Sequence, residues 1–191
     1  MNQIYFQLKK YMLQNKYLFI ADGSKLSFDK KLTKEGFKLT KNKHYCKALL
    51  STLYDVTNKM PIKCCIDKHA NERKSVIDNL LSEVPKNSTI LFDISKIFLK
   101  IFVAICRCLQ QTCAGYYSDE LVNIISQNNI KFIIRMKKSA LLVKYINENK
   151  ISDYIKTTKK YGQLRIVKYT INNKSYYMST NIYDMLLKIF Y

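Results

Sequence analysis

Two short apolar runs, each leading directly into an aspartate, stand out in the hydrophobic pattern of the chain. The mostly apolar run 17–21 precedes Asp22, and the run 89–92 precedes Asp93. Continuous runs of this length are typical of strands buried on both faces of a sheet. Turn-forming residues follow Asp22, so the first strand is expected to end there. The alternative for this aspartate is a turn residue that caps the next segment.

The matching form of these two stretches predicts parallel neighbouring strands. Their carboxylates, from Asp22 and Asp93, are then expected to face one pocket at the edge of the sheet. A carboxylate at such a position is costly unless something pairs with it, and a metal ion is the usual partner.

The rest of the pattern alternates between strands and helices. Further strands are expected at 48–54, 62–66, 130–137, 164–171 and 174–179, in which the first two and the last two form hairpins. Helices are expected in 1–16 and at 71–84, 94–114, 118–127, 141–147 and 182–191. This alternation is typical of an α/β domain with a mixed sheet.

Segment 26–47 has little apolar periodicity and carries many lysines, so it is expected to be an exposed loop. It is either a solvated segment or one that contacts phosphates. The whole chain has 33 basic and 14 acidic residues, a formal net charge of +19. Such an excess opposes folding by self-repulsion unless a polyanion is the normal partner. Nucleic acid is the first candidate partner and an anionic membrane surface the second.

The length of 191 residues suits a single domain. The polar N-terminal stretch does not resemble a secretory signal, and no apolar run reaches the ~18 residues of a membrane span. The six cysteines lack the paired spacing of a zinc site; Cys106, Cys108 and Cys113 are either buried thiols or ligands of a soft metal. These features favour an intracellular protein without a membrane anchor. Self-association to a homodimer is compatible with the sequence.

Several motifs resemble, in the right order, those of DDE transposases of the insertion-sequence-four family. The stretch Asp22-Gly23-Ser24-Lys25-Leu26, with 48–55 and 68–73, resembles the first catalytic strand and hairpin. The stretches 90–93 and 115–121 resemble the second catalytic region. The likeness covers nearly the whole chain.

The resemblance implies a ribonuclease-H-like fold: a mixed five-stranded sheet with flanking helices and an added β-hairpin. Two aspartates and one glutamate of such enzymes hold Mg²⁺ or Mn²⁺ and cut and join DNA at transposon ends. Asp22 and Asp93 match the two aspartates as catalytic and metal-binding residues. Oxygen ligands from several carboxylates are what a two-metal phosphoryl transfer site requires.

The chain departs from the family pattern at two places. It ends at or just before the point where the family's glutamate motif begins, so no residue matches the third carboxylate. Segment 94–114 stands where the family has a single residue, and is interpreted as an insertion. The sequence thus predicts one incomplete catalytic domain over 1–191, with a β-rich inserted subregion at 150–181.

Two functions follow from these observations. One is a transposase catalytic-core fragment that binds DNA and descends from a DNA-cutting and strand-transfer enzyme. The alternative is a catalytically inactive DNA-binding remnant of a transposase. In either case phosphate contacts are expected from five basic residues: Lys25, Arg73, Arg135, Lys137 and Lys138. The alternative for these residues is a solvated basic face.

Overall fold

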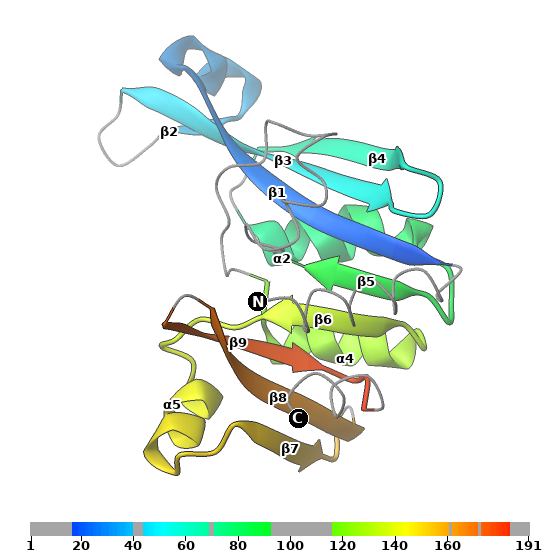
Figure 1. Cartoon of the computed structure of the whole chain (residues 1–191). Coiled ribbons are helices and arrows are strands. Elements are labelled where there is room, and N and C mark those ends of the chain that lie inside the picture. Colours follow the sequence, from blue (N-terminus) through cyan, green and yellow to red (C-terminus); the bar gives the residue numbers. More distant parts are fainter. Residues whose placement is uncertain are drawn as a thin grey trace.

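The protein is an α/β structure built on one mixed sheet (Figure 1). The computed structural model describes residues 17–39, 44–68, 71–92, 116–160, 162–171 and 173–183. The expected helices in 1–16 and 94–114, and most of the one at 182–191, lie outside the described residues. Within the described part of the chain, no helix has the length and apolar character needed to cross a membrane.

The described residues form nine strands and several short helical segments. The strands are β1 (Leu18–Asp29), β2 (Lys38–Leu39), β3 (Tyr45–Asp55), β4 (Met60–Asp67), β5 (Thr89–Phe92), β6 (Lys131–Arg135), β7 (Asp153–Thr158), β8 (Gly162–Ile171) and β9 (Lys174–Thr180). The α-helices are α2 (Glu72–Ser75), α4 (Asp119–Gln127) and α5 (Leu141–Glu148). The remaining helical segments are η1 (Lys30–Glu35), η2 (Val76–Leu80, a π-helix) and η3 (Leu81–Glu83).

The strand order along the sheet is β2-β3-β1-β5-β6-β9-β8-β7, and β4 also pairs with β3. β1, β5 and β6 are parallel to one another, and every other pairing is antiparallel. The prediction that the strands leading to Asp22 and Asp93 are parallel neighbours is therefore confirmed. The five strands expected for the core occur in the continuous order β4-β3-β1-β5-β6. The sheet is larger than expected because β9 pairs with β6 and brings β8 and β7 with it.

The prediction that the first strand ends at Asp22 is wrong. β1 continues to Asp29, and residues Phe19–Asp29 all pair with β3. The turn-like residues are held in the strand because β3 supplies a complete ladder opposite them. The later part of β1 also alternates, with Leu26 and Phe28 less exposed than their neighbours Lys25 and Ser27, which is ordinary strand patterning.

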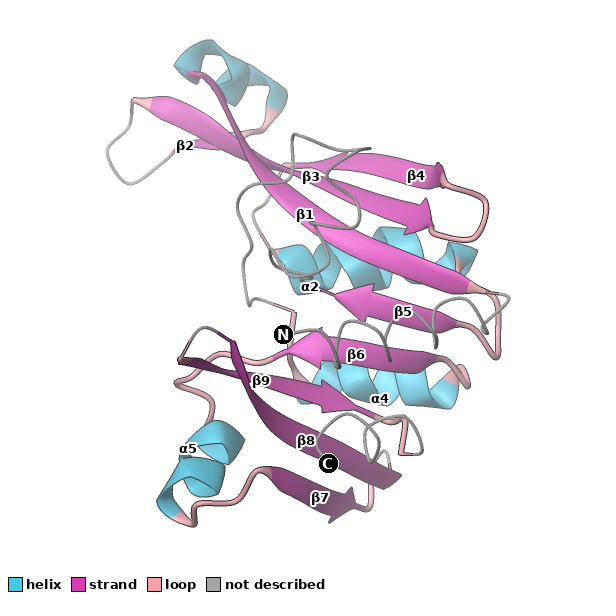
Figure 2. Cartoon of the chain, viewed as in Figure 1, coloured by secondary structure: helices cyan, strands magenta, loops and turns pink. Residues whose placement is uncertain are grey.

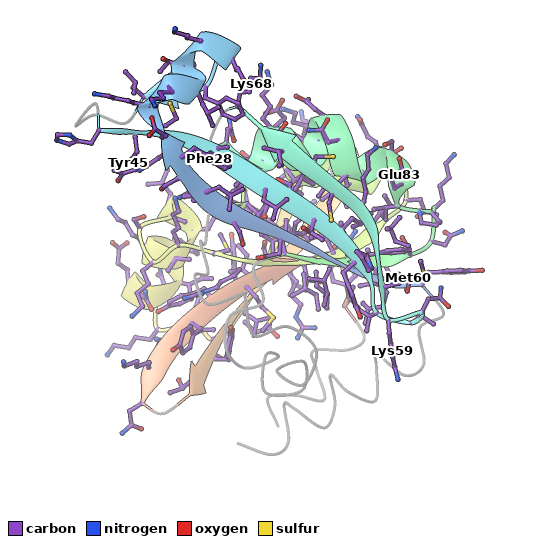
Figure 3. All side chains as sticks on the ribbon, turned by 90° about the horizontal axis from the view of Figure 1, so that it is seen from above. Phe28, Tyr45, Lys59, Met60, Lys68 and Glu83 are labelled. Atoms are coloured by element: carbon purple, nitrogen blue, oxygen red, sulfur yellow. The ribbon has the colours of Figure 1, made fainter. Side chains whose placement is uncertain are left out.

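The prediction of an exposed loop at 26–47 is also wrong in part. Its residues include the end of β1, the helix η1, β2 and the start of β3. Asp29 caps η1 by accepting a hydrogen bond from the backbone N–H of Lys31 at 2.8 Å. Seen from above, Phe28, Tyr45 and Lys68 gather at this end of the β1–β3 ladder, and Lys59 and Met60 mark the opposite, β3–β4 turn (Figure 3).

The helices α2 and α4 lie against one face of the sheet (Figure 2). Ser118 caps α4 as predicted, since its side chain accepts a hydrogen bond from the N–H of Leu121 at 3.2 Å. Strands and helices share one core, whose central residues are Phe19, Val76, Leu80, Ile90, Phe92, Leu121, Ile125 and Phe132. This packing fixes the start of α2 beside β1.

The β7–β9 region was expected to contain one hairpin, and β7 was not predicted. The hairpin β8–β9 is confirmed, with Asn173 in the left-handed conformation at its turn. β7 is attached by Arg165, which is buried and forms a bidentate pair with the Asp153 carboxylate. A third guanidinium contact is made to the carbonyl oxygen of Tyr183 at 2.6 Å.

We expect Asp153→Ala to destabilise the protein by about 2–3 kcal/mol, because it leaves the buried Arg165 charge without its carboxylate. This loss is smaller than is usual on breaking a buried ion pair, because the Asp153 side chain is 35% exposed. Urea unfolding followed by circular dichroism measures the effect. Glu83→Ala is the matched control: it removes the exposed Lys63–Glu83 pair, and it should destabilise the protein much less because solvent screens that pair. Equal losses in both variants would contradict the prediction.

Candidate metal site beside strand β1

Asp22 lies where the parallel pairing of β1 and β5 stops. The two strands pair from Leu18 to Ala21, and the last pair joins Ala21 to Phe92. Asp22 is the next residue of β1, and Asp93 is the next residue after β5. Asp93 lies outside the described residues. Asp22 pairs with Thr52 of β3 on its other side, so its backbone is fixed there.

A second carboxylate, that of Glu72, approaches the next residue of β1, Gly23, from helix α2. A Cβ atom added at Gly23 would lie 3.1 Å from Glu72 Cγ and 2.8 Å from the Tyr116 hydroxyl. Glycine is therefore required by close packing at this position, which explains the turn-like residue inside a strand. The Glu72 side chain is only 5% exposed.

The local sequence explains why Glu72 points inward. Asn71 caps α2, since its side chain accepts a hydrogen bond from the N–H of Lys74 at 3.3 Å. Glu72 is the first helical residue, where the helix dipole favours a negative charge. Ser75, one turn later on the same face, is also buried and is bonded to Asp67 and to Ser51. α2 thus begins with a buried polar face directed at β1, β3 and β4.

Glu72 differs from the other shielded acids because one of its two oxygens has no hydrogen-bond partner among the described residues. Asp55 accepts three hydrogen bonds in its turn, Asp67 accepts from Ser75 and Asn79, and Asp153 pairs with Arg165. In contrast, Glu72 Oε2 is buried and has no hydrogen-bond partner among the described residues. The nearest cation, Lys25 Nζ, is 3.7 Å from the other oxygen, Oε1. A buried carboxylate oxygen left in this state is costly.

The pKa of Asp22 also indicates a carboxylate in an unfavourable environment. Burial raises the pKa of the Asp22 carboxyl above its usual value, and the nearby Glu72 charge raises it further. A hydrogen bond from the Gly23 backbone N–H lowers this pKa and offsets part of the effect. Two carboxylates in a poorly solvated place, without enough donors, fit a divalent cation bound by oxygen ligands.

The described residues alone do not form a complete metal site. No group of three or more histidine, cysteine, aspartate or glutamate side chains is placed to hold a metal within the ranges that the structure describes. Asp22 and Glu72 supply two carboxylates. The pairing of Ala21 with Phe92 brings the chain that continues into Asp93 alongside β1.

The aromatic pair Phe92–Tyr116 closes the site on its core side. The two rings lie 5.4 Å apart, and both residues are buried. The last described residue before segment 93–115 and the first one after it are therefore in contact. The interpretation of 94–114 as an insertion stays a prediction, because that segment lies outside the described residues.

The basic residues predicted to bind DNA occupy two regions. Arg135, Lys137 and Lys138 line one groove, after the end of β6. Lys25 is beside Glu72, and Arg73 is exposed on α2. The structure therefore brings three of the five together, and their contacts with phosphate stay predictions.

Glu72 was missed from the sequence. It lies in the stretch 68–73 that carries part of the family likeness, but a glutamate in the first turn of a helix is usually exposed. The available signal was Ser75, which shares its helix face with Glu72 and interrupts an otherwise apolar pattern. No protein-family model matches this chain, and no curated protein matches its sequence.

Replacing Gly23 tests the close packing at the site. In Gly23→Ala the new methyl group would meet the Tyr116 hydroxyl and Glu72 Cγ, so we expect a loss of about 1–3 kcal/mol from overpacking. Ser24→Ala, one residue along the same strand, should change stability by less than about 0.5 kcal/mol. Thermal unfolding of both variants gives the comparison, and a Gly23→Ala protein as stable as the parent would refute the packing argument.

Replacing Asp22 tests its electrostatic setting. Burial raises the pKa of Asp22 in the folded state, so the folded state favours the protonated, neutral side chain. Protonation therefore stabilises the folded protein fully at pH values below the usual carboxyl pKa. This stabilisation is lost as the pH rises through the raised pKa. Asp22→Asn is neutral at every pH, so it should unfold at a higher temperature than the parent at neutral pH without divalent ions. The difference should close as pH falls toward about 4. A difference that stays constant with pH would contradict the raised pKa.

Proposed function

We propose that the chain is a DNA-binding catalytic-core fragment of the DDE transposase type, with a divalent-cation site at Asp22, Glu72 and Asp93. The fold supports this proposal through the continuous five-strand order β4-β3-β1-β5-β6. A mixed sheet with this number of core strands is what a ribonuclease-H-like fold requires. The observation that carries the proposal is the buried Glu72 oxygen, which has no hydrogen-bond partner among the described residues, together with the effect of the Glu72 charge on the pKa of Asp22.

The donor set suits Mg²⁺ or Mn²⁺. Both cations take oxygen ligands, and the site offers carboxylates without thiols or imidazoles among its described members. A cation bound there supplies charge neutralisation and polarisation of a phosphate oxygen. Lys25 balances part of the negative charge through Glu72.

DNA is the proposed partner because of both charge and arrangement. The net charge of +19 favours a polyanion as partner. This attraction does not depend on the sequence of bases. β1, β5 and β6 are parallel and adjacent, so Asp22 and Arg135 belong to the same edge of the sheet. Two strand spacings separate them, about 10 Å in the plane of the sheet. A DNA strand that contacts one region is thereby close to the other.

We expect metal binding without catalysis. No residue of the chain matches the family's third carboxylate, and Glu72 comes from a different element than that residue does. Groups displaced by only about 1 Å lose about a hundredfold in rate. The isolated chain should therefore bind Mg²⁺ or Mn²⁺ and yet neither nick nor join transposon-end DNA.

Thermal unfolding with increasing Mn²⁺ or Mg²⁺ tests the cation site. At ten times its dissociation constant the ion should stabilise the parent by about 1.4 kcal/mol. Asp22→Asn and Glu72→Gln should each lose this response, because each removes a negative ligand. Glu83→Gln makes the same chemical change at an exposed residue of η3 and should keep it. A parent protein that no divalent ion stabilises would refute the site.

Incubation of the purified chain with end-containing DNA and Mn²⁺ tests the absence of catalysis. We expect intact DNA after an incubation in which a complete transposase would react. Cleavage that Asp22→Ala, Asp93→Ala and Glu72→Gln each abolish would show an active enzyme and would overturn the fragment interpretation.

A further inference from the structure

A strongly basic groove lies at the end of β6 and beside the β8–β9 hairpin. Its volume is about 560 Å³, within the range of about 300–1,000 Å³ that ligand sites occupy. Four cations line it, and none of its lining residues within the described part of the chain is acidic. Its polar and aromatic lining consists mainly of Arg135, Lys137, Lys138, Lys174, Ser175 and Tyr176.

Arg135 is held by a row of side chains that crosses three adjacent strands. Its guanidinium carbon lies 5.4 Å from the centre of the Tyr176 ring. Tyr176 in turn stacks on Tyr169, with ring centres 5.5 Å apart and an interplanar angle of 22°. Since β9 lies between β6 and β8, Arg135 and Tyr169 flank Tyr176 from opposite sides. The two tyrosines are also direct cross-strand partners.

This row gives Arg135 a fixed place in the groove. A guanidinium over an aromatic ring keeps its N–H donors free at its edges. Those donors match the spacing of two oxygens on one phosphate group. A flexible lysine at the same place would supply charge without that geometry.

The other walls of the groove add positive potential from separate elements. Lys174 is exposed at the start of β9, and Lys137 and Lys138 are exposed after β6. Helix α5 begins next to the groove, after Ser139, and its N-cap residue Ala140 provides no side-chain hydrogen bond. The N–H groups of a first turn without a side-chain cap favour anions.

We propose that this groove binds the phosphodiester backbone of a DNA strand, with Arg135 as the anchoring residue and Tyr176 as the residue that positions it. This inference rests on the proposed function and specifies where that DNA lies. It adds Lys174 and the tyrosine pair, which the sequence did not single out. The groove is too large for one phosphate alone and suits a short run of backbone.

Binding of a fluorescent 30-base-pair DNA, measured in EDTA over a range of salt concentrations, tests the groove. Arg135→Gln should weaken binding about five- to tenfold near 0.1 M salt and lower the salt slope by about one. Tyr176→Leu should cause a similar loss although it removes no charge. The double variant should be no weaker than Arg135→Gln, because both changes remove the same contact.

Two controls separate positioning from general effects. Tyr176→Phe keeps the aromatic ring and should retain the affinity of the parent protein. Lys131→Gln removes one exposed charge from the opposite end of β6 and should change affinity less than about twofold. Thermal unfolding of each variant identifies any that fails to fold. If Tyr176→Leu or Arg135→Gln does not fold, the DNA affinities of Tyr176→Phe and Arg135→Lys are compared with that of the parent instead. Arg135→Lys keeps the charge but should still bind more weakly than the parent.

Three results would overturn the inference. If Arg135→Gln and Tyr176→Leu both bind like the parent, the groove does not hold DNA, and the cation site is unaffected. If only Arg135→Gln loses affinity, Tyr176 does not position it. If inorganic phosphate stabilises the parent but not Arg135→Gln, while both bind DNA equally, the groove is a site for free phosphate. A chain with no affinity for DNA would refute the proposed function as well, whereas the divalent-ion response tests that function without DNA.

Discussion

The unequal pairing of β1 determines the rest of the structure. On one side β1 pairs with β3 along nearly its whole length, and on the other it pairs with β5 only as far as Ala21. Beyond Ala21 the ladder with β3 continues and keeps the backbone of β1 rigid. Asp22 is the first residue there, and burial disfavours its charged form. The pKa of Asp22 is raised mainly because the side chain is buried at this position.

Helix α2 adds a second carboxylate near this part of β1. Its first residue, Glu72, lies against Gly23, and its charge helps to raise the pKa of Asp22. Natural proteins rarely leave buried carboxylates in this state without a cation or a proton. The neighbouring acids Asp55 and Asp67 show that the same fold can satisfy carboxylates fully where it needs them only for structure.

The sequence predicted the elements with strong local signals and missed features set by contacts distant in sequence. β5 was placed correctly because its apolar run is short and bounded, and α4 because Ser118 is a clear cap. Asp22-Gly23 was interpreted as a turn because glycine is most often used for its backbone freedom. Here it is used for its lack of a side chain, and only the positions of Tyr116 and Glu72 reveal that. The burial of Glu72 could not be predicted for the same reason: it depends on β1 and not on the helix.

The contact between Phe92 and Tyr116 has a consequence for the length of the segment that joins them. The residues on the two sides of segment 93–115 meet, and the entropy of closing a chain segment depends only weakly on its length: a doubling costs only about 0.6 kcal/mol. The core is continuous across this junction. The packing on either side of it therefore does not fix how many residues join the two rings, and a change in that number is expected to be tolerated by the core.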